Sequence, residues 1–202
     1  HVRERPRLML LVGSFILVTI VGQPFVTVLP ALLEHELGQP TERIGLLFTV
    51  EAVGGLATGL AIAGMMRGAG AWRLMLSMGV LSGVSMIALA VAPSFVTVLL
   101  AMFIVGVGYT GFQVTNNALL MMEADPAYFG RVMSLMMLAW GGQGLTALPI
   151  GVLADRIGER EVLAMEGVVI IVITVAAWVV YGAVVRRAER AALEVDWEAG
   201  GA

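Results

Sequence analysis

The chain has 202 residues, of which 59% are hydrophobic and 13% are charged, the latter about half the share found in soluble domains. A net charge of −3 does not favour nucleic acid as a partner. The sequence has no cysteine, which excludes disulfides and thiolate metal sites, and its two histidines lie outside or at the edge of the apolar stretches. We therefore expect an integral membrane protein with no metal, no cofactor and no catalytic residues, that is, not an enzyme.

Six apolar stretches fill most of the chain. A membrane-spanning helix needs about 20 mostly apolar residues. We predict such helices over residues 8–33, 44–66, 74–91, 95–122, 132–154 and 162–185. The predicted organisation is a segment of residues 1–7, an all-α membrane bundle of residues 8–185 and a mobile polar tail of residues 186–202.

The arginines predict the orientation of this bundle. Nine of the twelve fall on one side when six spans are counted: Arg3, Arg5, Arg7, Arg67, Arg73, Arg131, Arg186, Arg187 and Arg190. The other side receives Arg43, Arg156 and Arg160. Because basic residues gather on the cytoplasmic side of a membrane, both termini are predicted to be cytoplasmic.

The first predicted span is polar and carries two prolines. Pro24 removes a backbone donor and should kink the helix, which frees a carbonyl one turn earlier. Pro30 is a second candidate for a kink. Gln23 is a single amide at mid-depth, and such an amide either holds helices together or contacts a ligand.

Glu51 is the only ionisable residue well inside a predicted span. Gly54, Gly55 and Thr58 follow it at helical spacing, so its face is small and polar, which favours burial against protein. A carboxyl group held there could take up and release a proton. Two alternatives are a structural hydrogen bond across helices and a hydrated position near the outer surface.

The fourth predicted span carries a polar stripe at helical spacing, made of Tyr109, Gln113, Asn116 and Asn117. Such groups need either protein partners or water. The stripe therefore either faces an internal cavity and contacts a bound molecule, or it clamps neighbouring helices at about 1 kcal/mol per contact. In the fifth span, Gln143 is a further single amide at mid-depth.

The order of a polar, a glycine-rich and a plainer span occurs twice. Polar residues mark 8–33 and 95–122, glycines mark 44–66 and 132–154, and 74–91 and 162–185 are plainer. With three helices per unit, the second unit starts on the opposite side of the membrane. The predicted fold is thus six transmembrane helices arranged as two inverted three-helix repeats, although any six-helix bundle also distributes its polar residues unevenly.

Over about residues 8–185 the chain resembles the C-terminal six-helix half of a major facilitator superfamily transporter. The seventh helix of that family is similar to Gln23-Pro24-Phe25 followed by Leu29-Pro30. The junction of its tenth and eleventh helices, in the efflux branch related to siderophore and macrolide exporters, is similar to Asn116-Asn117, Asp125-Pro126 and Gly130-Arg131-Val132. The end of the eleventh helix is similar to Pro149-Ile150-Gly151 followed by Asp155-Arg156 and Gly158.

This resemblance implies secondary transport by alternating access, as proton-coupled efflux of a small, partly apolar compound. It implies a midplane cavity lined by candidates Gln23, Tyr109, Gln113, Asn116, Asn117 and Gln143, with Glu51 as the candidate for proton coupling. Expected partners are the substrate, the lipid of a bacterial-type inner membrane, and an N-terminal six-helix half of the same polypeptide or a second copy. Two alternatives stay open: a complete half-length transporter acting as a homodimer, and a non-transporting six-helix assembly or regulatory subunit.

One loop departs from the family pattern. The family often has an acid and a cluster of basic residues between its eighth and ninth helices. Here residues 64–73 keep Gly64 and Arg73 but lack the acid, which puts a gating salt bridge in doubt in this half. Asp155-Arg156 fits the motif better, but it falls on the opposite side of the predicted topology, where a helix end with interfacial charges is the simpler interpretation.

Overall fold

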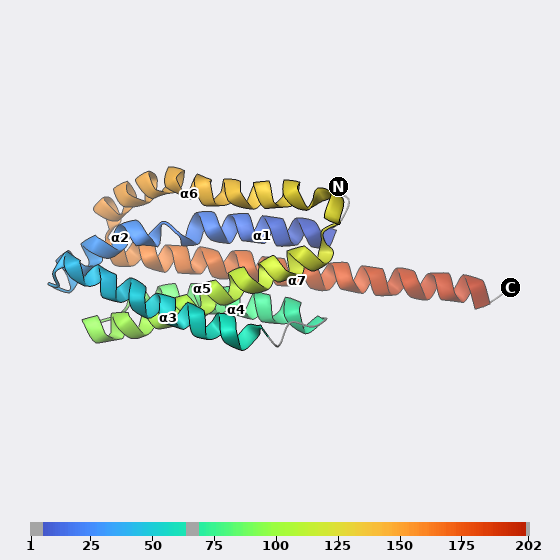
Figure 1. Cartoon of the computed structure of the whole chain (residues 1–202), viewed down its shortest axis with the longest axis horizontal. Helices are drawn as coiled ribbons and strands as arrows, with labels where there is room; N and C mark the ends of the chain where they lie inside the picture. The colour runs from blue at the N-terminus through green and yellow to red at the C-terminus, as the bar shows by residue number, and fades with distance from the viewer. Residues whose placement is uncertain (1–5, 64–68, 201–202) are drawn as a thin grey trace.

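The computed structural model describes residues 6–63 and 69–200, with the exception of the side chains of residues 69, 143, 185 and 187–200. The described residues form helices joined by short turns, with no strand among them (Figure 1). The helices are α1 (Pro6–Gly22), α2 (Phe25–Ala31), η2 (Leu32–Glu36), η3 (Thr41–Arg43), α3 (Ile44–Ile62), α4 (Ala69–Ala90), α5 (Phe95–Glu123), η4 (Pro126–Tyr128), α6 (Phe129–Ile157) and α7 (Glu159–Gly200).

Six helical segments among the described residues are long and apolar enough to cross a membrane, which confirms the predicted number of spans. The first of them is composite and consists of α1, α2 and η2. The starts of α3 and α5 coincide with the predicted starts, whereas residues 64–66, the end of the second predicted span, lie outside the described residues. At the start of α5, Ser94 forms a capping box with Thr97, which satisfies two backbone donors of the first turn.

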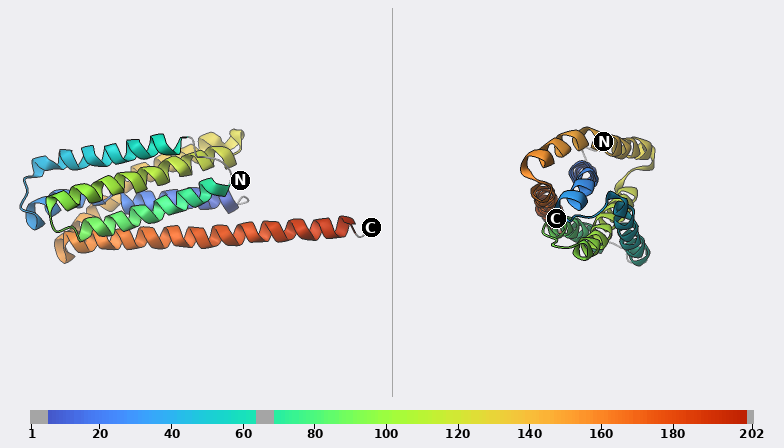
Figure 2. Two further views of the ribbon diagram at one scale, coloured as in Figure 1. Left: turned by 90° about the horizontal axis from the view of Figure 1, so that it is seen from below. Right: turned by 90° about the vertical axis from the view of Figure 1, so that its left-hand side faces the viewer.

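The last helix is longer than the sequence pattern predicts. The apolar span ends at Val184, close to the predicted end at residue 185. We expected a mobile tail over residues 186–202, but α7 continues as a helix to Gly200 and extends beyond the bundle (Figures 1 and 2), and residues 201–202 lie outside the described residues. Residues 186–194 are rich in Ala, Arg, Glu and Leu, which are strong helix formers even without an apolar stripe. A search for apolar runs does not detect such a polar continuation.

The helices alternate in direction, so both termini lie at the same end of the bundle (Figure 1). The first unit consists of α1, α2, α3 and α4, and the second unit consists of α5, α6 and α7. The units exchange partners: α1 packs against α6 and α7, whereas α5 packs against α3 and α4. The end view places α3 and α6 on opposite sides of the bundle, with α1 inside (Figure 2). The first helix of each unit thus packs against the second and third helices of the other unit, as an inverted repeat requires.

The centre of this symmetry is the crossing of α4 and α7, which run antiparallel (Figure 1). A Cβ atom added to Gly83 would lie 2.6 Å from the carbonyl oxygen of Gly167, and one added to Gly167 would lie 2.6 Å from that of Gly83. Each glycine also faces the isoleucine four residues beyond its partner, Ile171 or Ile87. A reciprocal contact of antiparallel helices has a two-fold axis perpendicular to them, which is the in-plane axis of an inverted repeat.

The first span is interrupted at Gln23 and Pro24, where α1 ends and α2 begins (Figure 1). Because Pro24 has no N–H, the carbonyl of Ile20 loses its helical partner one turn earlier. The hydroxyl of Thr146 in α6 donates a hydrogen bond to that carbonyl, with Oγ1 and O 3.2 Å apart. Pro30 lies inside α2, which passes into the π-helical turn η2 directly after Ala31.

Candidate functional site

A polar cluster joins α1 to α5 in the interior of the bundle. Tyr109 and Gln113 of α5 are each 8% exposed. The Gln113 amide donates to the Tyr109 hydroxyl at 2.7 Å and to the Thr19 hydroxyl of α1 at 3.4 Å. The side chain of Gln23 is also within hydrogen-bonding reach of the Tyr109 hydroxyl. Because α5 contains no proline, one straight helix carries both side chains toward α1.

The rest of the predicted stripe faces different surroundings. Asn116 is fully buried, and its amide donates to the carbonyl of Leu11 in α1 at 3.1 Å and contacts the sulfur of Met75 in α4 at 3.4 Å. Asn117 is only half-buried. The structure thus brings Tyr109 and Gln113 together, while Asn116 bridges three helices one turn further along. The buried amide oxygens of Gln113 and Asn116 accept no hydrogen bond from the described residues.

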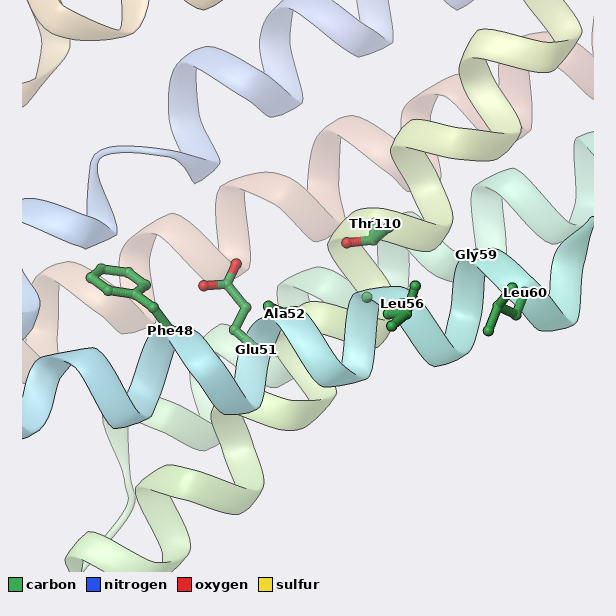
Figure 3. A pocket seen from close by; sticks show the side chains of 8 residues that line it. Phe48, Glu51, Ala52, Leu56, Gly59, Leu60 and Thr110 are labelled. Carbon is green, nitrogen blue, oxygen red and sulfur yellow. The ribbon is translucent and has the colours of Figure 1, made fainter.

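A groove of about 610 Å³ runs beside Glu51 (Figure 3). Its lining comes from two helices, with Phe48, Glu51, Ala52, Gly55, Leu56, Gly59 and Leu60 from α3 and Thr110 from α5. The carboxyl group of Glu51 and the hydroxyl of Thr110 point to the same side of α3 (Figure 3). Glu51 is half-buried and is the only charged side chain among the described residues that line the groove. A volume of this size suits a small molecule.

Glycines bring α3 close enough to α5 to form this groove. A Cβ atom on Gly54 would collide with the carbonyl oxygen of Phe103, and one on Gly106 would collide with that of Glu51. One on Gly55 would lie 2.5 Å from the Thr110 hydroxyl oxygen, so the absence of a side chain there leaves room for that hydroxyl. These contacts show the close approach of helix backbones that small residues allow in lipid.

A smaller cavity of about 290 Å³ lies beside the helix break. Its lining consists of Gln23, Pro24, Val26 and Thr27 from the first span and Gly144 and Ala147 from α6. Gln143 belongs to the same part of α6, but its side chain lies outside the described residues. Gln23 therefore borders two features at once, this cavity and the Tyr109 cluster.

The predicted gating residues lie at opposite ends of the bundle. Arg73 is exposed in the first turns of α4, at the end that carries both termini. Asp155 and Arg156 are exposed in the last turn of α6, and Gly158 ends that helix with a positive φ of 104°. The structure does not bring these charges together.

Two groups of buried or paired charged residues were not predicted from the sequence. Glu166 lies near the start of the last predicted span, residues 162–185, and its side chain is only 3% exposed. At the end of the bundle opposite the termini, which we term the outer end, Arg160 binds Glu36 at 2.8 Å and the carbonyls of Ala90 and Ala92 at 2.7 and 3.0 Å. Beside it, His35 bonds Glu159 at 2.9 Å. The helical spacing of Glu166 with buried Ile170 and Thr174 is the signal that could have revealed its burial.

A bundle of six apolar helices related by an in-plane two-fold axis is typical of secondary membrane transporters. A family model described as "Major Facilitator Superfamily" matches residues 1–144, which is more than half of the chain. The chain belongs to this superfamily of membrane transporters, and it is an integral membrane protein. No curated protein matches it.

Proposed function

We propose that the chain is one half of a proton-coupled exporter of small, partly apolar compounds that works by alternating access. The observation that carries this proposal is the half-buried carboxyl group of Glu51 in a groove next to the polar cluster of Tyr109 and Gln113. A single carboxylate with no cation in the lining favours compounds that are neutral or positively charged. Gln23, Asn117 and Gln143 are the further candidates for contact with such a compound.

The groove requires a partner surface to enclose a substrate. Its described lining comes from α3 and α5, and two large apolar side chains in that lining, Leu56 and Leu60, are 66% and 72% exposed. On the other edge of the bundle, Leu145 and Leu148 of α6 are 82% and 76% exposed. We propose that an N-terminal six-helix half or a second copy covers the groove, in a bacterial-type inner membrane with both termini cytoplasmic.

The Glu51→Gln variant tests proton coupling. Cells that produce the chain together with a partner half are loaded with a panel of fluorescent, partly apolar compounds, and efflux is followed with and without a proton gradient. We expect Glu51→Gln to abolish uphill efflux while exchange of compound without a gradient survives, because exchange needs no change of protonation. Membrane insertion should be unchanged, since glutamine nearly matches the shape of glutamate.

The matched control is Glu42→Gln, which removes an exposed carboxylate from η3 at the outer end. This variant should pump as the unaltered protein does. Normal, pH-dependent uphill efflux by Glu51→Gln would remove Glu51 from the coupling mechanism. Absence of any efflux from the unaltered protein, with correct insertion, would instead support a non-transporting membrane subunit.

A further inference from the structure

The most deeply buried carboxyl group among the described residues is that of Glu166 in α7. Its side chain is 3% exposed, and neither of its oxygens has a hydrogen-bond partner among the described residues. The neighbouring Gly167 forms the tight crossing with Gly83 of α4. Ile170, one turn further along α7, would contact a Cβ atom on Gly22, the last residue of α1. Glu166 therefore lies level with the break between α1 and α2.

Among the residues that the structure describes, no cation contacts this carboxyl group. The first span carries no charged residue between Leu8 and Leu33, and α4 carries none beyond Arg73 in its first turns. The first span, α6 and α7 carry charged and titratable groups at the outer end of the bundle, namely Glu34, His35, Glu36, Asp155, Arg156, Glu159, Arg160 and Glu161. Of these, the guanidinium of Arg160 is already bound to Glu36 and to two carbonyls of α4. A carboxylate without donors or a counter-ion is costly in such a place, so the neutral acid is the form that fits.

The same stripe of α7 connects Glu166 to the outer surface. Glu159 is seven residues earlier, which places it on the same helical face, about 10 Å away along the axis. Its carboxylate is bonded to His35 of η2, whose side chain is exposed. Between the two acids lie Val162 and Leu163, which are 1% and 0% exposed. A proton-exchanging pair at the surface is thus separated from a buried acid by one layer of apolar side chains.

The helix that covers this layer is bounded by two irregularities. α2 packs against α7, and it has only seven residues between the break at Pro24 and the π-helical turn η2. Irregular turns of this kind are frequent at functional sites in helices. A displacement of α2 would open the seam between α2 and α7 and admit water to Glu166.

We propose that Glu166 is a second proton-binding site, loaded from the outer end through the seam between α2 and α7. A proton passes from hydronium, or from the imidazolium of His35, to a carboxylate oxygen of Glu166; an O–H bond forms, and water or neutral imidazole is left behind. The shut seam holds the neutral acid, and the open seam allows the proton to leave again. The evidence for a proton-binding site is the burial of Glu166. A role of this site in coupling rests, in addition, on the transport function proposed above.

Infrared spectroscopy of the complete protein in lipid tests the site without a substrate. We expect the unaltered protein at neutral pH to show the C=O stretch of a protonated carboxyl group. Glu166→Gln should lose this band, whereas Glu161→Gln, which removes an exposed acid from the same helix, should keep it. No such band in the unaltered protein, or a band lost only in Glu51→Gln, would overturn the proposal.

Exchange in heavy water tests the route and needs no change at Glu166. The band of the unaltered protein should shift slowly after transfer to heavy water, because Leu163 seals the seam. Leu163→Ala should speed this shift severalfold, whereas Met165→Ala, on a half-exposed position of the same helix, should leave it unchanged. Equal exchange in all three proteins contradicts the route. If the band behaves as expected but the unaltered protein moves no compound, the transport function fails while the proton site stands.

Discussion

The helices α1 and α5 begin the two units of the inverted repeat, and only one of them is continuous. α5 runs for 29 residues without a proline, from its capping box at Ser94 to Glu123. α1 ends after 17 residues, because Pro24 interrupts the helix. The carbonyl of Ile20, which thereby loses its helical partner, accepts a hydrogen bond from Thr146. The symmetry of the fold therefore comes from the crossing of α4 and α7, and it does not require the two opening helices to be alike.

The continuous helix α5 is therefore the rigid one of the two, and the interrupted first span is the one that can bend. The straight α5 holds Tyr109 and Gln113 in fixed register, and these side chains meet Thr19 of α1 just before the break. Variants can therefore test three interfaces separately: the symmetric crossing, the contacts of α5 with α1, and the break itself.

The largest effect is expected at the crossing. In Gly83→Ala the added Cβ would lie 2.6 Å from a backbone oxygen of α7, so the helices must separate. We expect the free energy of unfolding to fall by about 1–3 kcal/mol, measured by thermal unfolding in detergent. Gly13→Ala in α1, where no atom lies within 4 Å, is the control and should be neutral or slightly stabilising. Equal loss in both variants would mean that the crossing does not determine the symmetry.

The next largest effect is expected where α5 is fastened to α1. Asn116→Ala removes the hydrogen bond to the carbonyl of Leu11 and leaves a small cavity in the buried interface. We expect a loss of about 1–2 kcal/mol in unfolding free energy. The adjacent half-buried residue provides the comparison, since Asn117→Ala should change stability by less than about 0.5 kcal/mol. The reverse ranking would show that Asn117, not Asn116, holds the helices together.

A double-mutant cycle examines the break. Thr146→Val removes the donor to the carbonyl of Ile20 and should cost about 1 kcal/mol in the otherwise unaltered protein. In a Pro24→Ala background the new N–H of residue 24 can bond that carbonyl, so the same change should cost almost nothing. An identical cost in both backgrounds would show that the Thr146 bond does not compensate for the proline.

The smallest effect is expected at the surface end of the α1–α5 pair. Arg7 and Glu123 approach within 3.6 Å, and both side chains are partly exposed. Arg7→Gln should lower the unfolding free energy by no more than about 0.5 kcal/mol, and raised salt should abolish the difference from the unaltered protein. A loss above 1 kcal/mol would show that this pair matters as much as the buried contacts.

The number of spans and the inverted repeat could be predicted because they depend on apolar length and on the order of helix types. The rotation of each helix could not. Asn116 and Asn117 are neighbours on one predicted stripe, yet a turn of about 100° between them separates a fully buried bridge from a half-exposed side chain. The burial of Glu166 likewise depends on which side of α7 meets α1 and α4, which the distance of a residue from the end of a span does not specify.

At the candidate site, the sequence could predict only which residues share a face of one helix. The spacing of Tyr109 and Gln113 correctly placed them on one face, and the spacing of Glu51, Gly54 and Gly55 correctly placed that carboxyl group on the small face of α3. Their partners across the bundle, Thr19 for Gln113 and Thr110 for Gly55, lie many residues away along the chain, and a single sequence has no periodicity that links them. Whether these residues bind a compound stays a prediction.

The exchange of partners between the units has a consequence for biosynthesis. Within this chain the ribosome makes α1, α3 and α4 before α6 and α7, yet α1 packs against both of these later helices. The glycine face of α4 is likewise exposed to lipid until Gly167 of α7 has been inserted. The earlier helices must therefore remain stable as separate spans, and these contacts form only after α7 has entered the membrane.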